Sequence, residues 1–395
     1  MAREDGQFTA NRQKGNPIQH EKPEGHLTLL SLCESPQATL TQLEECLDLG
    51  ADPNAATSEG KTPLHFAAER NRNPRIVRGL IRAGADVNAR FLGKWTPLHF
   101  ATMNQENPTV LRTLLRAGAD IEASDDEGRT PLHFAARWNP TVGNLDPLIR
   151  GGARLDALDH HGSGPLVYAV EYNPSLQVVR KLIAAGADPD GGGGHTPLQA
   201  ACRRDDVRFL EAVLAVGADP KRQSPIFTAA AKGRVEHIEL LLDAGSDPME
   251  VFTGELPTPL HAACRFSKDV GVTRRLVECG IDLETANHEG RTPLHLAAEF
   301  RPRHVDCLLE AGANPNAADA RGETPLHRAI VTPSLNQHFM VPLFKRYGSN
   351  LNARDLEGNT PRDTVRIRLA DAPRVRREWE FSLTFHGGRA SGGNA

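Results

Sequence analysis

A four-residue motif, Thr-Pro-Leu-His, recurs along this chain at a nearly constant spacing. Full copies begin at Thr62, Thr96, Thr130, Thr258, Thr292 and Thr324, and degenerate copies begin at Gly164, Thr196, Ser224 and Thr360. Successive copies start 28 to 36 residues apart. Such regularity is typical of a chain built from one supersecondary unit that buries its apolar face against its neighbours. The spacing therefore predicts a solenoid rather than a domain with one unique active site.

The residues around one copy of the motif predict two short helices and a turn. Thr62 suits the N-cap of the first helix, and Pro63 suits its first position, where a missing N–H costs nothing. Gly84 suits the left-handed residue that ends the second helix. The apolar faces of the two helices are short and narrow: Leu64, Ala67 and Ala68 in the first, then Ile76, Val77, Leu80 and Ile81 in the second.

The period that starts at Thr62, TPLHFAAERNRNPRIVRGLIRAGADVNARFLGKW, resembles the ankyrin repeat. The resemblance covers roughly residues 26–380. It implies an all-α solenoid of helix-turn-helix units joined by β-turns or hairpins, in a single elongated and curved domain. It also implies that partners bind to the hairpin tips and to the exposed ends of the first helices, which line the concave face.

The motif positions also predict the domain boundaries. We expect residues 1–25 to be disordered, residues 26–370 to form the repeat domain and residues 371–395 to form a C-terminal tail. Residues 26–54 lack the motif but keep the second-helix pattern, as an N-terminal cap would. Full repeats are expected to begin near residues 55, 89, 123, 157, 191, 220, 250, 285 and 317, and a truncated capping unit near residue 353.

Four early repeats carry Asn-Pro between their two helices, at Asn73, Asn107, Asn139 and Asn173. Proline fixes φ and stops the preceding helix, so we expect each proline to begin the second helix.

The middle of the chain departs from the pattern. Gly191–Gly194 replaces one turn tip, and only Pro220–Gln223 separates Asp219 from the motif copy at Ser224. This interval is too short for a hairpin and predicts a local gap or bend near residues 190–224. Two interpretations stay open, a hinge between two blocks of repeats and a decayed repeat.

Composition narrows the function classes. The formal charge of −4 and the pI near 6.5 give no overall signal for nucleic acid or a membrane as partner. The six cysteines form no CxxC pair and fall within expected helices, which predicts free thiols and a reducing compartment. No apolar run approaches the ~18 residues of a membrane span. We expect a soluble, monomeric, intracellular and cytoplasmic protein, with the nucleus left open.

The sequence predicts no catalytic, cofactor-binding or metal-binding residues. The recurring motif histidines would stand roughly 8–10 Å apart in neighbouring repeats, too far to share one ion. The resemblance implies that they make structural hydrogen bonds between repeats. Asp159-His160-His161 is the best metal candidate in the chain, but a turn tip supplies no fourth ligand there.

The expected partner-binding residues lie at the tips and helix ends. Large aromatic residues and arginine at exposed positions are the usual anchors of an interface. The predicted set is Phe91, Leu92, Lys94, Trp95, Arg129, Arg137, Trp138, His160, His161 and Tyr172. Phe91, Trp95, Trp138 and Tyr172 are expected to form one hot spot, with Asp126 and Glu127 beside it. The alternative for Trp95 and Trp138 is packing against adjacent repeats.

The C-terminal segment offers a second surface. Residues 362–379 hold six arginines, and Glu378–Phe385 alternates polar and apolar residues as a half-buried strand would. A capping helix with a solvated arginine face and a tail that docks on a partner are both compatible with this pattern.

These observations predict a non-enzymatic protein-interaction module or scaffold that binds another protein through the concave face. One alternative is a regulatory or targeting subunit of a larger, possibly enzymatic, assembly. Another is binding of an anionic ligand by the arginine-rich tail.

Overall fold

The computed structural model describes residues 24–70, 73–103, 108–251, 254–330 and 337–387. Within this part of the chain the regular structure is helical, and the single β-bridge joins Phe91 to Trp95. The all-α solenoid predicted from the motif is therefore confirmed. Of the segment expected to be disordered, residues 1–23 lie outside the described residues, and Glu24 and Gly25 begin the first helix.

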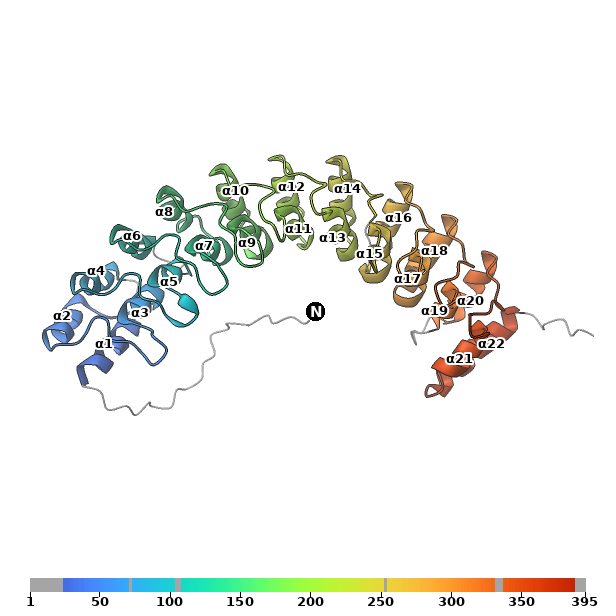
Figure 1. The fold of residues 1–395 in the computed structure, drawn as a ribbon, viewed down its shortest axis with the longest axis horizontal. Coiled ribbons are helices and arrows are strands. Elements are labelled where there is room, and N and C mark those ends of the chain that lie inside the picture. Colours follow the sequence, from blue (N-terminus) through green and yellow to red (C-terminus); the bar gives the residue numbers. More distant parts are fainter. Residues whose placement is uncertain (1–23, 71–72, 104–107, 252–253, 331–336, 388–395) are drawn as a thin grey trace, which may run out of the picture. The chain divides into compact units, whose positions relative to one another are not determined.

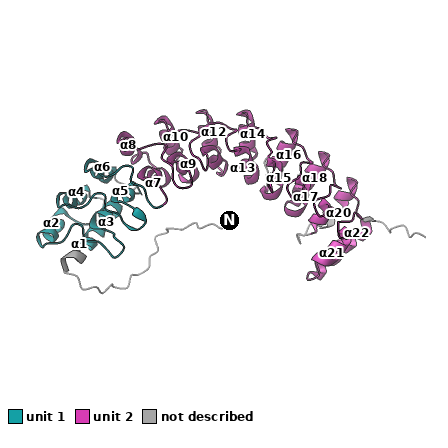
Figure 2. Ribbon diagram, viewed as in Figure 1, with its two compact units in different colours: residues 1–126 teal, residues 127–395 magenta. Residues whose placement is uncertain are grey.

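Contacts divide the chain into two compact units, residues 1–126 and residues 127–395 (Figure 2). The first unit holds α1 (Glu24–Glu34), α2 (Leu40–Asp48), α3 (Pro63–Arg70), α4 (Pro74–Arg82), the 3-10 helix η1 (Leu92–Lys94), α5 (Pro97–Met103) and α6 (Pro108–Arg116). Within it the first helices α1, α3 and α5 pack in series, and so do the second helices α2, α4 and α6 (Figure 1).

The second unit repeats the same arrangement. Its helices are α7 (Pro131–Trp138), α8 (Leu145–Arg150), α9 (Pro165–Tyr172), α10 (Leu176–Ala184), α11 (Pro197–Cys202), α12 (Arg208–Leu214), α13 (Pro225–Lys232), α14 (Val235–Asp243), α15 (Pro259–Phe266), α16 (Val270–Glu278), α17 (Pro293–Phe300), α18 (Pro302–Glu310), α19 (Pro325–Ala329), α20 (Gln337–Arg346), α21 (Pro361–Arg368) and α22 (Pro373–Gly387). The odd-numbered helices each contact the next odd-numbered helix from α7 to α21. The limits of the repeat domain and its tail stay a prediction.

The local roles predicted for the motif match the structure. The proline of each motif copy is the first residue of a helix. Leu64, Ala67 and Ala68 have no exposed surface, nor have Ile76 and Leu80 of the second helix. Within each unit, the core thus consists of small and aliphatic side chains between the first and second helices.

The Asn-Pro prediction is confirmed for α4 and α6, which begin at their prolines, although Asn107 lies outside the described residues. It is wrong in the next two repeats, where α8 begins at Leu145 and α10 at Leu176. There the side-chain oxygens of Asn139 and Asn173 accept the N–H two residues further on, at 3.0 and 2.8 Å. The Arg75 N–H donates to Asn73 in the same way at 3.0 Å although α4 begins at its proline, so this turn alone does not set where the second helix begins.

The helices near residues 190–224 stack without a gap, and the bend expected there stays a prediction. α11 packs against both α9 and α13, and α12 packs against both α10 and α14. Gln199 Nε2 donates to the backbone oxygen of Gln223 at 2.7 Å and so joins the two repeats. Gln223 and Ser224 adopt φ values of 56° and 47°, which turn the chain into α13 without a hairpin. Hinge and decayed repeat both stay open as interpretations.

The strand expected at Glu378–Phe385 is wrong, because these residues belong to α22. Trp379, Ser382 and Leu383 are buried, at positions i, i+3 and i+4, while Phe381 and Phe385 are exposed. The alternation over eight residues was misleading, since burial follows the helical period. α22 packs against α20 and α21, as a capping helix would.

A buried charge network joins the last repeats. The Arg328 guanidinium in α19 lies 2.5 Å from the carboxylate of Glu299 in α17 and 2.9 Å from that of Glu323. Arg368 of α21 also pairs with Glu323. Arg328, Glu299 and Glu323 are all buried, so each charge depends on its partners for compensation.

Candidate protein-binding surface

The C-terminal ends of α7 and α9 place a cation among three aromatic rings. The Arg137 guanidinium carbon lies 4.0 Å from the centre of the Tyr172 ring, 4.8 Å from the centre of the Trp138 ring and 5.9 Å from that of Tyr168. Trp138 keeps 46% of its surface exposed and Tyr172 keeps 47%. We call Arg137, Trp138, Tyr168 and Tyr172 the Arg137 cluster. Such contacts are favourable because the ring faces are electron-rich.

A buried asparagine holds the two helix ends together. Asn173 Nδ2 donates to the backbone oxygen of Ala136 at 2.7 Å and to that of Asn139 at 2.8 Å. These carbonyls end α7, whereas Asn173 follows α9 directly. The asparagine of the Asn-Pro pair therefore fixes the spacing between Trp138 and Tyr172.

We call the loop before each motif copy a finger. The Arg137 cluster is hydrogen-bonded to the finger that precedes α9. The Tyr168 hydroxyl donates to Asp159 at 2.7 Å, and the backbone N–H groups of His161 and Ser163 donate to the same carboxylate at 2.8 Å. Burial, followed by the bond to Asp159, raises the pKa of Tyr168 above its usual value.

These bonds also define the environment of the metal candidate Asp159-His160-His161. Both histidine side chains are exposed, while Asp159 is buried and accepts three hydrogen bonds. Among the residues that the structure describes, no three side chains of His, Cys, Asp or Glu gather in a way that could hold a metal ion.

Two neighbouring fingers contact each other beside this cluster. His160 N–H donates to the backbone oxygen of Glu127 at 2.9 Å. A Cβ atom on Gly128 would lie 2.8 Å from the His160 ring, so the fingers approach closely there. Arg129 pairs with Glu127 and lies 5.0 Å from the centre of the Phe134 ring. Arg129 and His160, predicted as partner contacts, therefore also stabilise the fingers.

The remaining predicted residues lie in the first unit, on the finger before α5. Leu92 is exposed, and Lys94 forms an exposed ion pair with Asp126 at 2.9 Å. The Phe91 ring lies 6.0 Å from that of Phe100, and the half-buried Trp95 ring lies 5.4 Å from it. Phe91 and Trp95 thus both pack on α5.

The four predicted hot-spot aromatics therefore separate into two groups. Phe91 and Trp95 belong to residues 1–126, and Trp138 and Tyr172 belong to residues 127–395. The structure brings together each pair through shared neighbours, Phe100 in the first case and Arg137 in the second. A single hot spot of all four stays a prediction.

The sequence analysis missed a second arginine of the same kind. Arg265 lies 5.5 Å from the centre of the Phe266 ring and 5.2 Å from that of Phe300. It also donates to Glu255 at 3.0 Å. A sequence pattern could have identified this site. Arg265 and Phe266 end the first helix of one repeat, and Phe300 ends the first helix of the next repeat, as Arg137, Trp138 and Tyr172 do in theirs.

The motif histidines are structural. His295 Nδ1 lies 3.1 Å from the Thr292 N–H that donates to it, and its Nε2 lies 3.0 Å from the backbone oxygen of Glu323 in the next repeat. His133 and His261 make the same inter-repeat contact. Burial lowers the pKa of His261 and of His295 to about 4. The hydrogen bonds between repeats that the resemblance implied are therefore present.

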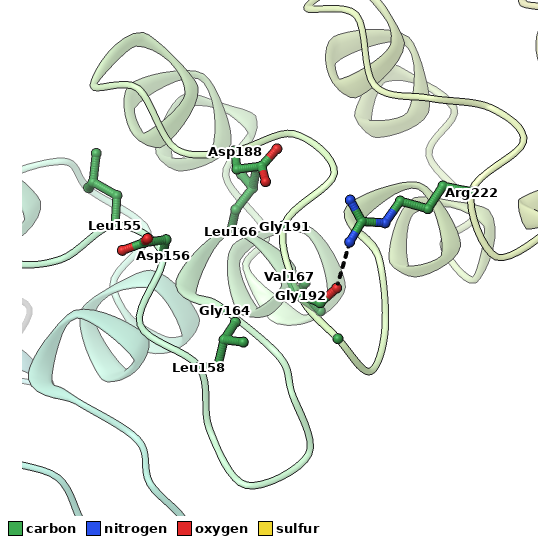
Figure 3. A pocket seen from close by; sticks show the side chains of 11 residues that line it. Leu155, Asp156, Leu158, Gly164, Leu166, Val167, Asp188, Gly191, Gly192 and Arg222 are labelled. Carbon is green, nitrogen blue, oxygen red and sulfur yellow. Dashed lines mark hydrogen bonds between the residues drawn. The ribbon is translucent and has the colours of Figure 1, made fainter.

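A pocket of about 340 Å³ lies beside the tetraglycine segment in the second unit (Figure 3). Its lining includes the apolar Leu158, Leu166 and Val167 and the acidic Asp156 and Asp188. Arg222, which also lines it, donates to the backbone oxygen of Gly192 at 3.2 Å. None of the lining residues belongs to the predicted partner-binding set.

All six cysteines are free thiols, as predicted. Burial raises the pKa of Cys33 to about 12, and it also raises that of Cys202 and Cys264. Within the described ranges, no helix is both long and apolar enough to cross a bilayer.

Comparison with known proteins places these features in context. A family model for ankyrin repeats in three copies matches residues 33–125, 98–192, 166–251 and 253–319. Human neurogenic locus notch homolog protein 4 is 42% identical over 87 residues, which are 22% of this chain and 4% of that protein. Mouse B-cell lymphoma 3 protein homolog is 28% identical over 182 residues, 42% of this chain and 40% of that protein.

A third relative is ankyrin repeat and SOCS box protein 16 of the mouse, 28% identical over 169 residues, 41% of this chain and 28% of that protein. The chain thus spans less than half the length of each of these three relatives.

Proposed function

This chain belongs to the ankyrin-repeat family, and we propose that it is a non-enzymatic module that binds another protein through its fingers and first-helix ends. Ankyrin repeats are generally protein–protein interaction modules. The observation that carries the proposal is the Arg137 cluster, in which Trp138 and Tyr172 stay half exposed although their positions are fixed. Preorganised aromatic side chains lose little conformational entropy on binding, which favours affinity.

The motif histidines support a structural role for the repeats themselves. His133 and His295 each use both ring nitrogens for hydrogen bonds within the protein, one of them to the next repeat. These histidines therefore join repeats. We propose that the partner contacts other side chains, at the helix ends where Trp138 and Tyr172 lie.

The test is a quantitative pull-down with the full chain, followed by affinity measurement on the protein recovered. We expect Trp138→Ala to weaken binding by about thirtyfold or more, since truncating an anchor costs ~2 kcal/mol or more. Phe381→Ala is the matched control, because Phe381 is another exposed aromatic residue, on α22. Binding that resists Trp138→Ala and Tyr172→Ala would refute the proposed surface.

The C-terminal helices carry the second candidate, binding of an anionic ligand. Arg374 is almost fully exposed on α22, and Phe381 and Phe385 are exposed at 66% and 71%. Arginines of these helices form ion pairs within the chain, Arg374 with Glu378 at 3.5 Å, Arg366 with Glu380 and Arg368 with Glu323. This candidate predicts that Phe381→Ala and Arg374→Gln weaken binding and that Trp138→Ala does not. A regulatory or targeting role in a larger assembly would appear as co-purified subunits.

A further inference from the structure

We propose that Arg137 is the receptor for a carboxylate of the partner, carried by an Asp or Glu next to an apolar residue in a peptide segment. The inference rests on the proposed function and names the partner chemistry of the same surface. It follows from comparing Arg137 with its counterpart Arg265 in the same unit.

The two arginines occupy equivalent places in their repeats. Each lies seven residues after the first residue of its motif, Thr130 or Thr258, and precedes an exposed aromatic residue. Each guanidinium also lies over an aromatic ring from the next repeat, Tyr172 at 4.0 Å and Phe300 at 5.2 Å. The same local geometry is therefore built twice.

The two sites differ in whether the chain itself supplies a carboxylate to the arginine. Arg265 Nη1 donates to Glu255 at 3.0 Å, so the chain itself supplies an acid there. Among the described residues, Arg137 forms no ion pair, and its buried Nε has no hydrogen-bond partner. Its interactions are those with the aromatic rings. Glu255 thus shows where a carboxylate sits on this kind of arginine.

The sequence explains why Arg137 lacks an internal acid. Glu127 and Glu255 each lie three residues before their motif threonine. In the earlier repeat Arg129 directly precedes the threonine and pairs with Glu127, whereas the later repeat has the uncharged Pro257 at that place. The repeat with Arg291 before its threonine behaves as the Arg129 repeat does, since Arg291 pairs with Glu289 at 2.9 Å.

The nearest acid on the other side is also engaged. Glu171, which precedes Tyr172, pairs with Arg203 at 3.2 Å. Arg204 donates to the backbone oxygens of Val170 and Glu171, and these bonds add no negative charge. Arg137, Arg203 and Arg204 thus face two carboxylates, Glu171 and the Asp159 that is bonded to Tyr168, which leaves one positive charge to complement an acidic segment.

The aromatic rings of Trp138 and Tyr172 indicate which kind of side chain the ligand carries beside its carboxylate. The half-exposed Trp138 and Tyr172 lie beside the guanidinium and offer apolar surface next to its charge. A carboxylate accepts well from a guanidinium, and the bond is strong when water is partly excluded. The best match is an Asp or Glu with an aliphatic or aromatic neighbour.

The probe is a displayed library of random twelve-residue peptides, selected on the full chain and counter-selected on Arg137→Gln. We expect the selected peptides to share an acidic residue beside an apolar one. By fluorescence anisotropy, Arg137→Gln should raise the Kd of such a peptide at least tenfold. A peptide with that acid changed to its amide should bind wild type and Arg137→Gln with equal Kd. Arg150→Gln, an exposed arginine of α8, is the matched control.

A second variant tests the internal comparison. Arg129→Gln frees Glu127, which should then occupy the position on Arg137 that Glu255 takes on Arg265. Peptide binding should weaken severalfold, and adding Glu127→Gln should restore it. Unchanged affinity in Arg129→Gln would show that the Glu255 position is not where the ligand carboxylate binds.

The outcomes separate this inference from the proposed function. If Trp138→Ala raises the Kd of the peptides but Arg137→Gln leaves it within twofold of wild type, the proposed binding surface is retained and the role of Arg137 as carboxylate receptor is overturned. Peptides insensitive to both variants overturn both proposals. A library that yields no peptide discriminating wild type from Arg137→Gln also overturns the carboxylate receptor. Thermal midpoints of all variants confirm that the effects are on binding.

Discussion

The Nε2 atom of His295 lies 3.0 Å from the backbone oxygen of Glu323, one repeat further along the chain. Because Nδ1 of the same ring accepts the Thr292 N–H at 3.1 Å, the ring proton belongs on Nε2. A neutral imidazole can make both bonds, whereas a doubly protonated ring would lose the bond from Thr292. Protonation would keep the bond from Nε2 to Glu323 and break the one from Thr292, so the capped start of α17 depends on the protonation state of His295.

We expect the protein to lose stability as the pH falls from about 6.5 towards 4. Burial lowers the pKa of His295 to about 4, while an unfolded histidine has a pKa near 6.5. In this window the unfolded chain binds the proton first, so stability is present above pH 6.5 and is lost on acidification. Each such histidine contributes a slope of up to ~1.4 kcal/mol per pH unit. Urea unfolding at pH 7 and pH 5 measures the change.

His295→Gln is the matched variant, because Gln199 already takes this role in the repeat that contains α11. Its side-chain oxygen accepts the Thr196 N–H at 3.3 Å, and its Nε2 donates to the next repeat. We expect His295→Gln to fold at pH 7 and to lose less stability at pH 5 than wild type. Equal pH dependence in the two proteins would contradict the assignment.

Two substitutions in one motif copy should differ in cost. Leu294 is buried between repeats, and Leu294→Ala should cost ~2–5 kcal/mol through the cavity that it leaves. Thr292→Ala should cost less, ~1 kcal/mol, because it removes a cap. Chemical denaturation of both variants decides the order, and a larger loss for the threonine variant would reverse the roles given to the motif.

Trp95 and Trp138 should respond differently to truncation. Both tryptophans belong to the hot spot expected from the sequence, with packing against adjacent repeats as the alternative. Since Trp95 packs 5.4 Å from Phe100, we expect Trp95→Ala to destabilise the first unit by roughly 1–3 kcal/mol. Trp138→Ala should change stability less. Hydrogen exchange of α3 and α5 reports the difference, and unchanged protection in Trp95→Ala would contradict its packing role and favour a role in binding.

Much of the fold follows from short-range patterns. The Thr-Pro start of α7 and the buried Leu132 were predictable because capping and helical period act within a few residues. The start of α8 was not, because Asn139 makes the same local turn as Asn73 and yet α8 begins only at Leu145. In its repeat the backbone of Asn139 is also bonded to Asn173 of the next repeat. The Arg137 cluster shows the same limit, since Arg137 and Trp138 were selected by type but their relation to Tyr172 depends on inter-repeat packing.

The terminal helix gives the next prediction. Trp379 is almost fully buried although sequence alternation suggested a strand. We expect Trp379→Ala to cost ~3–5 kcal/mol and to loosen α20 to α22, and Phe381→Ala to change stability by less than ~0.5 kcal/mol. Limited proteolysis together with thermal unfolding compares the two. Similar stability for both variants would mean that α22 does not cap the repeats.

The charges buried around Arg328 limit how this gene can change in length. Where neighbouring units share one motif, unequal crossing-over that removes a whole period rejoins surfaces that still match. Removing the period that contains Glu299 would instead leave Arg328 to share Glu323 with Arg368 inside the protein, and charge left uncompensated in a buried ion pair costs up to roughly 3–5 kcal/mol. A chain shortened by one period should therefore lose more stability when the loss includes α17 than when it falls among the early repeats. Repeats that share the same motif therefore differ in whether the protein can lose them during evolution.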